Sequence, residues 1–275
     1  QPNGDGVQPA TGAVLDPAQP GQARARLRVP TEASQGYDHI LGQITKLVEM
    51  LEKEVGGSRP RVIGFGTPGT TEPSTGAMKN CNTTALNGRF LGAELSRILG
   101  VEARLANDAN CFALAEATLG AAKGRRVVMG LIMGTGVGGG IVVDGKVING
   151  CHGIGGEWGH NPIPGESHPC YCGRAGCVET VIAGPSLERF YREKSGQQAD
   201  LRAIVKRATE GDAVAVETLE RLRTRFGQAI AAVINILDPD AIVIGGGVGN
   251  LDLLYTAETR QAVGRFLFNP EVKTE

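Results

Sequence analysis

Short apolar runs that end in glycine alternate with helical patterns along most of this chain. The runs are RVIGFG (61–66), VVMGLIMG (127–134) and AIVIGGG (241–247), and helical spacing of apolar residues marks 38–55 and 212–236. Runs of this length bounded by glycine are typical of buried strands. Strands that alternate with helices predict an α/β fold. Because α/β sheets bind ligands at the carboxyl ends of their strands, the glycine-rich ends are the first places to look for a site.

Three further segments extend this pattern, and one departs from it. We expect a helix over 91–99 that ends at Gly100, a helix over 109–122, and a hairpin in IVVDGKVI around Asp144 and Gly145. Residues 1–22 carry four prolines and little hydrophobic pattern, so we expect an irregular arm there.

Composition excludes several classes of partner. Lysine and arginine number 28 against 29 aspartates and glutamates, a net charge of −1. We therefore expect neither nucleic acid nor an anionic membrane as a partner. No apolar run reaches the length of about 18 residues that a membrane span needs, and the N-terminus lacks a signal pattern. These features predict a cytoplasmic protein.

The segment EWGHNPIPGESHPCYCGRAGCVET (157–180) concentrates soft metal ligands. His160, Cys170, Cys172 and Cys177 supply one nitrogen and three sulfurs, the closed ligand set typical of structural zinc. His152 and His168 are alternative ligands, and three reduced thiols without a metal remain the other interpretation. The six cysteines do not form the pattern of a disulfide framework. We expect Cys81, Cys111 and Cys151 to be buried small apolar side chains.

Two glycine runs are candidates for phosphate contacts. GTGVGGG (134–140) would leave backbone N–H groups to face phosphate oxygens, with the hydroxyl of Thr135 beside them, although a plain hairpin turn explains it equally well. It is neither a Walker loop, because Gly-Lys-Ser/Thr is missing, nor a dinucleotide fingerprint, because a strand follows. IGGGVGN (244–250) is similar and weaker.

Three acidic residues also have two possible interpretations each. Asp108 follows an apolar strand and precedes a helix, so it is either a helix cap or a general base at the mouth of a cleft. Glu157 and Glu179 flank the cysteine cluster and are either solvated acids or ligands for sugar hydroxyls.

Taken together, these motifs resemble one family. LANDANC, MGTGVGGG, GEWGH, CYCGRAGCVET and NILDPDAIVIGGG occur in the order seen in the ROK family of bacterial sugar kinases and repressors. NTTALNG (82–88) and GEWGHNPIP are most similar to the fructokinase/mannokinase branch, with N-acetylglucosamine kinases next. The resemblance covers about residues 23 to 275.

The resemblance implies a two-lobed actin-like ATPase fold, of the RNase H-like type. Residues 23–108 would form the N-terminal lobe and residues 109–275 the C-terminal lobe, which holds a zinc loop over 157–180. The family's opening strand with Asp-x-Gly-Gly-Thr-Lys has no counterpart in residues 1–13, so we expect an incomplete N-terminal lobe. Hexose and ATP are the implied partners, and a homodimer fits the family.

Residue roles carry over motif by motif. Asp108 resembles the catalytic base. The sugar ligands would be Asn107, Glu157, His160, Glu179 and Gly69. The ATP-binding residues would be Gly134, Thr135, Gly136, Val137, Gly138, Gly139, Gly140, Ile141, Gly245, Gly246 and Gly247. Mg²⁺ would accompany ATP, and His160 with Cys170, Cys172 and Cys177 would bind structural Zn²⁺.

The implied activity is ATP-dependent phosphorylation of a hexose, with D-fructose to fructose 6-phosphate expected first. N-acetylglucosamine, mannose and glucose are alternative substrates within the family. Two alternatives from another class are a sugar-binding pseudokinase, which the missing phosphate motif leaves open, and a sugar-responsive repressor. Residues 1–37 are too short and too rich in proline and glycine for the repressors' helix-turn-helix domain.

Overall fold

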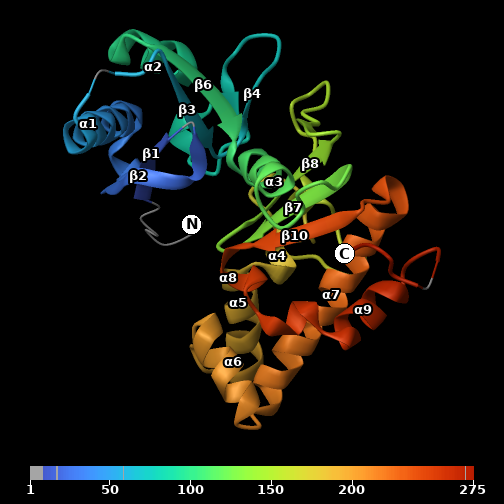
Figure 1. Ribbon diagram of the computed structural model, residues 1–275. Helices are drawn as coiled ribbons and strands as arrows, with labels where there is room; N and C mark the ends of the chain where they lie inside the picture. Colours follow the sequence, from blue (N-terminus) through green and yellow to red (C-terminus); the bar gives the residue numbers. More distant parts are fainter. Residues whose placement is uncertain (1–8, 17, 58, 270) are drawn as a thin grey trace. The chain divides into compact units, whose positions relative to one another are not determined.

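The computed structural model describes residues 9–275 except 17, 58 and 270 (Figure 1). The chain divides into two compact units. Unit 1 is Gln1–Asp108 with Cys151–Gly153, and unit 2 is Ala109–Gly150 with Ile154–Glu275. Both mix helices with strands, as the sequence predicted. Within the described residues, no helix is both long and apolar enough to cross a bilayer.

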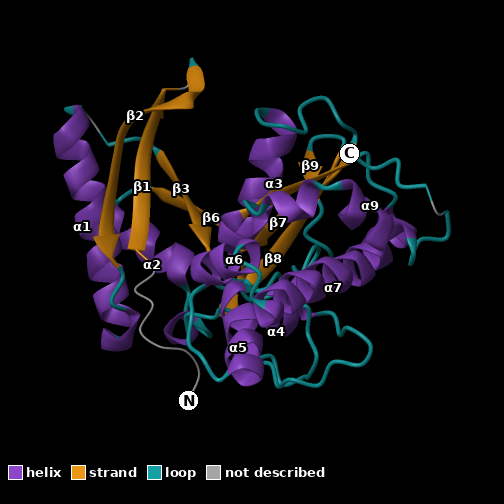
Figure 2. Cartoon of the chain, turned by 90° about the horizontal axis from the view of Figure 1, so that it is seen from below, coloured by secondary structure: helices purple, strands orange, loops and turns teal. Residues whose placement is uncertain are grey.

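Unit 1 begins with an antiparallel hairpin of β1 (Pro9–Asp16) and β2 (Gln19–Pro30). Helix α1 (Tyr37–Val55) lies along this hairpin and buries Leu47 and Leu51 against it (Figure 2). The expected irregular arm is therefore wrong over 9–16 and 19–22, while residues 1–8 lie outside the described residues. The small side chains of the hairpin give a weak local signal, and packing on α1 supplies the missing apolar contact.

The second part of unit 1 is a pair of parallel strands, β3 (Val62–Thr67) and β6 (Glu102–Asn107). A small hairpin, β4 (Thr70–Thr71) with β5 (Met78–Lys79), lies between them in sequence. Helix α2 (Leu91–Leu99) ends at Gly100, as predicted, and shares an apolar core with α1 and the strands. Short 3₁₀ turns are η1 (Ala33–Gln35) and η2 (Thr84–Leu86).

Unit 2 is built on a four-stranded sheet in the order β10-β7-β8-β9. These strands are β7 (Val127–Met133), β8 (Val137–Val143), β9 (Lys146–Val147) and β10 (Ala241–Gly245). β10 runs parallel to β7, whereas β8 is antiparallel to both neighbours.

Helices make up most of the rest of unit 2. The long helix α7 (Ala213–Leu237) supplies much of the largest apolar core of the described chain. The others are α3 (Asp108–Thr118), α4 (Glu179–Ile182), α5 (Gly184–Ser195), α6 (Leu201–Thr209), α8 (Gly246–Gly249) and α9 (Ala257–Gly264). The 3₁₀ turns η3 (Trp158–His160) and η4 (Asp252–Tyr255) complete the set.

The glycine run 134–140 is not the single loop that the sequence predicted. Only residues 134–136 turn, and Val137 begins β8. The strand glycines make room for neighbouring backbone. A Cβ on Gly140 would lie 2.8 Å from the carbonyl oxygen of Ala109 in α3, and one on Gly139 would lie 2.7 Å from that of Gly156. Close packing onto β8 therefore explains glycines that resembled a longer phosphate loop.

Two cysteine expectations are wrong and one is confirmed. Cys81 is buried at 2 % exposure, whereas Cys111 and Cys151 are exposed. Cys111 lies on α3, off the buried face that Ala109, Ala113 and Ala117 form, and the even spread of small apolar residues along the helix hid that face in the sequence. The predicted helix over 109–122 also ends earlier, at Thr118, and a turn follows it.

Candidate active site

Three of the predicted site residues come together at the carboxyl ends of β3 and β6. Asn107 is the last residue of β6, Asp108 is the first of α3, and Gly69 follows β3. The side-chain Nδ2 of Asn107 donates a hydrogen bond to the carbonyl oxygen of Gly69, at 3.0 Å. This is the sheet edge at which α/β proteins bind ligands.

Gly69 is required at its position by both conformation and space. Its φ of 69° lies in the left-handed region. A Cβ there would lie 2.4 Å from the carbonyl oxygen of Lys79 and 2.8 Å from the backbone nitrogen of Cys81. The turn after β3 is therefore pressed directly against the strand end of the β4–β5 hairpin.

The four predicted metal ligands form one cluster in unit 2. The ligand atoms of His160, Cys170, Cys172 and Cys177 all lie within 4.8 Å of one another. The Sγ atoms of Cys172 and Cys177 are 3.6 Å apart, and Cys170 Sγ is 3.6 Å from His160 Nδ1. Zinc bonds of about 2.3 Å to sulfur and about 2.0 Å to nitrogen give tetrahedral edges of about 3.5 to 3.8 Å. These two edges match a tetrahedral metal site, and no other pair of ligand atoms is more than 4.8 Å apart.

Tyr171 is a neighbour of this cluster that sequence reasoning missed. Its hydroxyl lies 3.0 Å from His160 Nε2, and the two rings meet edge to face. If Nδ1 binds a metal, Nε2 would carry the ring N–H and could donate it to Tyr171, as metal-bound histidines commonly do. His168, the alternative ligand, is not in the four-residue cluster of the described chain.

Protonation of the thiols competes with the binding of a cation, so occupation of the cluster depends on pH. Burial and the neighbouring thiols of Cys172 and Cys170 raise the pKa of Cys177 to about 12. Metals bind the thiolate, so occupation of the cluster would release protons and weaken as the pH falls.

Backbone pairing closes the neck of the 157–180 loop. The N–H of Ile163 donates to the carbonyl of Gly176 at 2.8 Å, and the N–H of Val178 donates to that of Asn161 at 2.9 Å. The segments that follow Glu157 and precede Glu179 therefore lie side by side.

An ion cluster attaches the middle of this loop to α7. Glu166 accepts two hydrogen bonds from Arg221, at 2.8 and 2.6 Å, and one ion pair from Arg225 at 2.8 Å. The Glu166 side chain is only 11 % exposed. Burial alone would raise the pKa of Glu166, but the two guanidinium groups outweigh it and hold that pKa below its usual value.

Glu179 lies against the turn after β7. Its Oε2 accepts the backbone N–H of Val137 at 2.9 Å, and a Cβ on Gly136 would lie 2.6 Å from the same oxygen. The N–H of Gly184 donates to the carbonyl of Gly134 at 2.8 Å. A predicted sugar ligand and the predicted phosphate turn are thus in direct contact within unit 2.

The two predicted nucleotide runs meet at one edge of the unit 2 sheet. Gly134 follows β7 and Gly245 ends the parallel strand β10. A Cβ on Gly246 would lie 2.4 Å from the carbonyl oxygen of Met133. Thr135 is exposed at this edge, whereas Val137, Gly139 and Gly140 are buried in β8.

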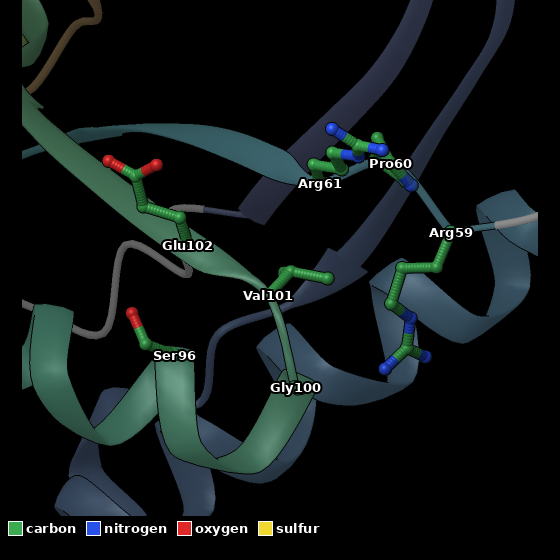
Figure 3. Close-up of a pocket in the computed structure, with 7 residues that line it drawn as sticks. All are labelled: Arg59, Pro60, Arg61, Ser96, Gly100, Val101 and Glu102. Atoms are coloured by element: carbon green, nitrogen blue, oxygen red, sulfur yellow. The ribbon is translucent and has the colours of Figure 1, made fainter.

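A hollow of about 710 Å³ in unit 1 lies at the opposite ends of the strands (Figure 3). Its lining comes from residues just before β3, among them Arg61, and from Gly100 to Glu102 at the start of β6. Arg59 is already paired with Glu52 and donates to the carbonyl of Leu99 at 2.6 Å. The hollow is therefore separate from the predicted site residues, which lie at the carboxyl ends of β3 and β6.

The fold is that of the actin-like sugar kinases. The chain is similar to a ROK hexokinase from Thermus thermophilus, with a TM-score of 0.77 and 32 % identity over 89 % of this chain and 82 % of that one. It is also similar to a ROK glucokinase from Streptomyces griseus solved with glucose and AMPPNP, with a TM-score of 0.78 and 25 % identity over 94 % and 86 %.

The chain belongs to the ROK family, whose sequence model matches residues 6–275. An N-acetyl-D-glucosamine kinase of Aliivibrio fischeri is 36 % identical over 83 % of this chain and 78 % of its own length. Seven further curated relatives with the same name are 34–38 % identical. The family resemblance is confirmed, and sugar kinase activity is supported, whereas a preference for fructose is not.

The Glu166 cluster yields a prediction about the loop. Glu166→Gln keeps the shape but removes the charge that pairs with Arg221 and Arg225. We expect the backbone amides of 161–178 to exchange faster at pH 7 in the variant, by an amount equivalent to a decrease of about 1–3 kcal/mol in the free energy of loop opening. Hydrogen exchange with mass spectrometry measures these rates. The pKa of Glu166 is lower in the folded protein than the ordinary glutamate value. The loop of the wild-type protein is therefore more stable than that of the variant above the ordinary glutamate pKa, and this difference is lost as the pH falls through the pKa of folded Glu166.

The matched control is Glu210→Gln, which removes an exposed ion pair with Lys206 on α6. It should leave exchange in the loop unchanged. Equal exchange in Glu166→Gln and wild type would show that the ion cluster does not hold the loop.

Proposed function

We propose that the protein transfers the γ-phosphate of ATP to a primary hydroxyl of a hexose. The observation that carries this is the grouping of Asp108, Asn107 and Gly69 at the carboxyl ends of β3 and β6. Family membership and the nucleotide-bound glucokinase relative support the same reaction.

In the proposed reaction, Asp108 accepts the proton of the hexose hydroxyl as its oxygen bonds to the γ-phosphorus of ATP. The bond from that phosphorus to the bridging oxygen breaks, and ADP leaves. Backbone N–H groups of the 134–136 turn and of 245–247 would hold the phosphates and nucleoside. Mg²⁺ bound with ATP would offset phosphate charge, which is the main requirement of phosphoryl transfer.

We propose N-acetyl-D-glucosamine as the preferred hexose. The eight relatives at 34–38 % identity are N-acetyl-D-glucosamine kinases, and this outweighs the NTTALNG and GEWGHNPIP runs that pointed to fructose. Glu157, His160 and Glu179 from unit 2, with Asn107 and Gly69 from unit 1, would bind the sugar hydroxyls.

We further propose zinc as the ion of the His160–Cys170–Cys172–Cys177 cluster. Three thiolates with one imidazole are the soft, closed set that zinc favours for a structural role. The ion would fix the loop whose ends carry Glu157 and Glu179, and would take no part in phosphoryl transfer.

A hexose panel tests the proposed activity. Purified protein is given MgATP and, in turn, N-acetylglucosamine, fructose, glucose and mannose, and sugar phosphate and ADP are both measured. We expect one ADP per sugar phosphate and the highest kcat/KM for N-acetylglucosamine. A higher kcat/KM for fructose than for N-acetylglucosamine would contradict the proposed preference and support the fructose preference predicted from the NTTALNG and GEWGHNPIP runs. Sugar binding without any phosphate product would support a sugar-binding pseudokinase and contradict the proposed transfer.

Asp108→Asn separates catalysis from helix capping. Asparagine caps helices about as well as aspartate but cannot accept the proton. We expect kcat to fall by about 10² to 10⁴ while the sugar Kd changes little. Asp200→Asn is the matched control, because Asp200 caps α6 by accepting the N–H of Ala203, and it should keep full activity. An unchanged kcat in Asp108→Asn would identify a cap and exclude the base.

Metal content tests the zinc proposal. We expect one zinc per wild-type chain by mass spectrometry of the native protein, and loss of most of it in Cys172→Ser. Cys151→Ser, which changes an exposed thiol of unit 1, should retain the zinc. Wild-type protein with reduced cysteines and no zinc would refute the proposal.

A further inference from the structure

The run NTTALNG (82–88), which the proposed chemistry does not use, contains Asn87, whose side chain makes two hydrogen bonds to the backbone. Asn87 Oδ1 accepts the backbone N–H of Cys81 at 2.9 Å, and Asn87 Nδ2 donates to the backbone carbonyl of Cys81 at 3.1 Å. One side chain thus satisfies both backbone groups of one residue. The Asn87 side chain fixes Cys81 in orientation as well as in position.

Cys81 in turn holds the turn after β3. Its thiol donates a hydrogen bond to the carbonyl oxygen of Pro68 at 3.1 Å. Burial raises the pKa of the Cys81 thiol to about 11, so it stays protonated and able to donate. A Cβ on Gly69 would lie 2.8 Å from both the sulfur and the nitrogen of Cys81, so Gly69 rests directly on this residue.

The turn is therefore held from two sides. Cys81 fixes the carbonyl of Pro68, and Asn107 fixes the carbonyl of Gly69 at 3.0 Å. These contacts connect Asn87 to Asn107, the residue before the proposed base, and every member lies in unit 1.

We propose that Asn87 and Cys81 are positioning residues for hexose binding, which act by orienting Gly69 and the Asn107 amide. This inference rests on the proposed function, because Gly69 and Asn107 are its sugar ligands in unit 1. The ligand class is a hexose, whose hydroxyls need hydrogen-bonding groups held to within a fraction of an ångström. Neither residue touches the sugar in this account.

The test compares variants by their KM for N-acetylglucosamine and for ATP. Asn87 is exposed, so Asn87→Ala removes the two hydrogen bonds without opening a core cavity. We expect its sugar KM to rise about three- to tenfold, the effect of about one hydrogen bond, with the ATP KM unchanged. Cys81→Ala should act in the same direction. Cys81→Ser, which keeps a donor for Pro68, should recover most of the sugar affinity.

Asn235 offers a matched control in unit 2. Its side chain donates to the carbonyl of Phe266 at 3.1 Å and accepts the N–H of Phe268 at 3.0 Å, the same kind of two-bond contact with the backbone. Asn235→Ala should change neither KM, whatever it does to the melting temperature.

Three outcomes distinguish the explanations. A normal sugar KM in both Asn87→Ala and Cys81→Ala would overturn the inference and leave these residues a purely structural role. An equal rise in the sugar and ATP KM would also overturn it, because it would indicate general loosening. If the wild-type protein neither binds nor phosphorylates any hexose, the proposed function itself fails. This outcome is distinct from the other two because it is seen in the wild-type protein and not only in the variants. Should Asn87→Ala not fold, the Cys81→Ala and Cys81→Ser pair decides.

Discussion

The closed neck of the loop between β9 and α4 is the constraint on which the proposed sugar site depends. Backbone hydrogen bonds pair 161–163 with 176–178, and the His160, Cys170, Cys172 and Cys177 side chains converge just beyond this pairing. A long loop with little regular structure loses much conformational entropy when it is ordered. Four ligands on one ion, together with the Glu166 ion cluster on α7, can offset that loss. The ion and the Glu166 cluster would thereby hold Glu157 and Glu179, at the two ends of the loop, in fixed positions.

Single hydrogen bonds then connect the proposed ligands to the strand ends. Glu179 accepts the N–H of Val137, so this proposed sugar-binding residue and the proposed phosphate turn constrain each other in unit 2. Asn107 donates to Gly69 in the same way in unit 1. Glycine is needed at position 69 because of its positive φ and because a Cβ would strike the backbone of Lys79 and Cys81, whereas a Cβ on Gly136 would meet only the carboxylate end of Glu179. In both units the proposed site consists of a strand end, a glycine turn and one side chain that holds the turn.

Much of this could be predicted from the sequence, and the exceptions have physical reasons. Periodicity, a local property of the sequence, predicts the strands over 61–66 and 127–134 and the helix over 38–55. Ligand chemistry, which is also local, predicts the metal cluster. The β1–β2 hairpin was missed because its stability comes from α1, which lies farther along the chain. The glycines of 137–140 resembled a loop because sequence alone does not distinguish a glycine that faces a ligand from one that faces Ala109 or Gly156. Tyr171 and Asn87 were missed because their contacts, with His160 and with the backbone of Cys81, do not belong to any sequence motif.

Titration of N-acetylglucosamine into metal-loaded and metal-stripped protein tests the central claim most directly. The protein is stripped with a zinc chelator under reducing conditions, and hexose and ATP affinities are measured by calorimetry before and after zinc is returned. The account predicts that stripping weakens hexose binding at least about tenfold, leaves ATP binding within about twofold, and is reversed by zinc. Unchanged hexose affinity in protein verified to hold no metal would contradict it, because the loop would then position Glu157 and Glu179 without the ion.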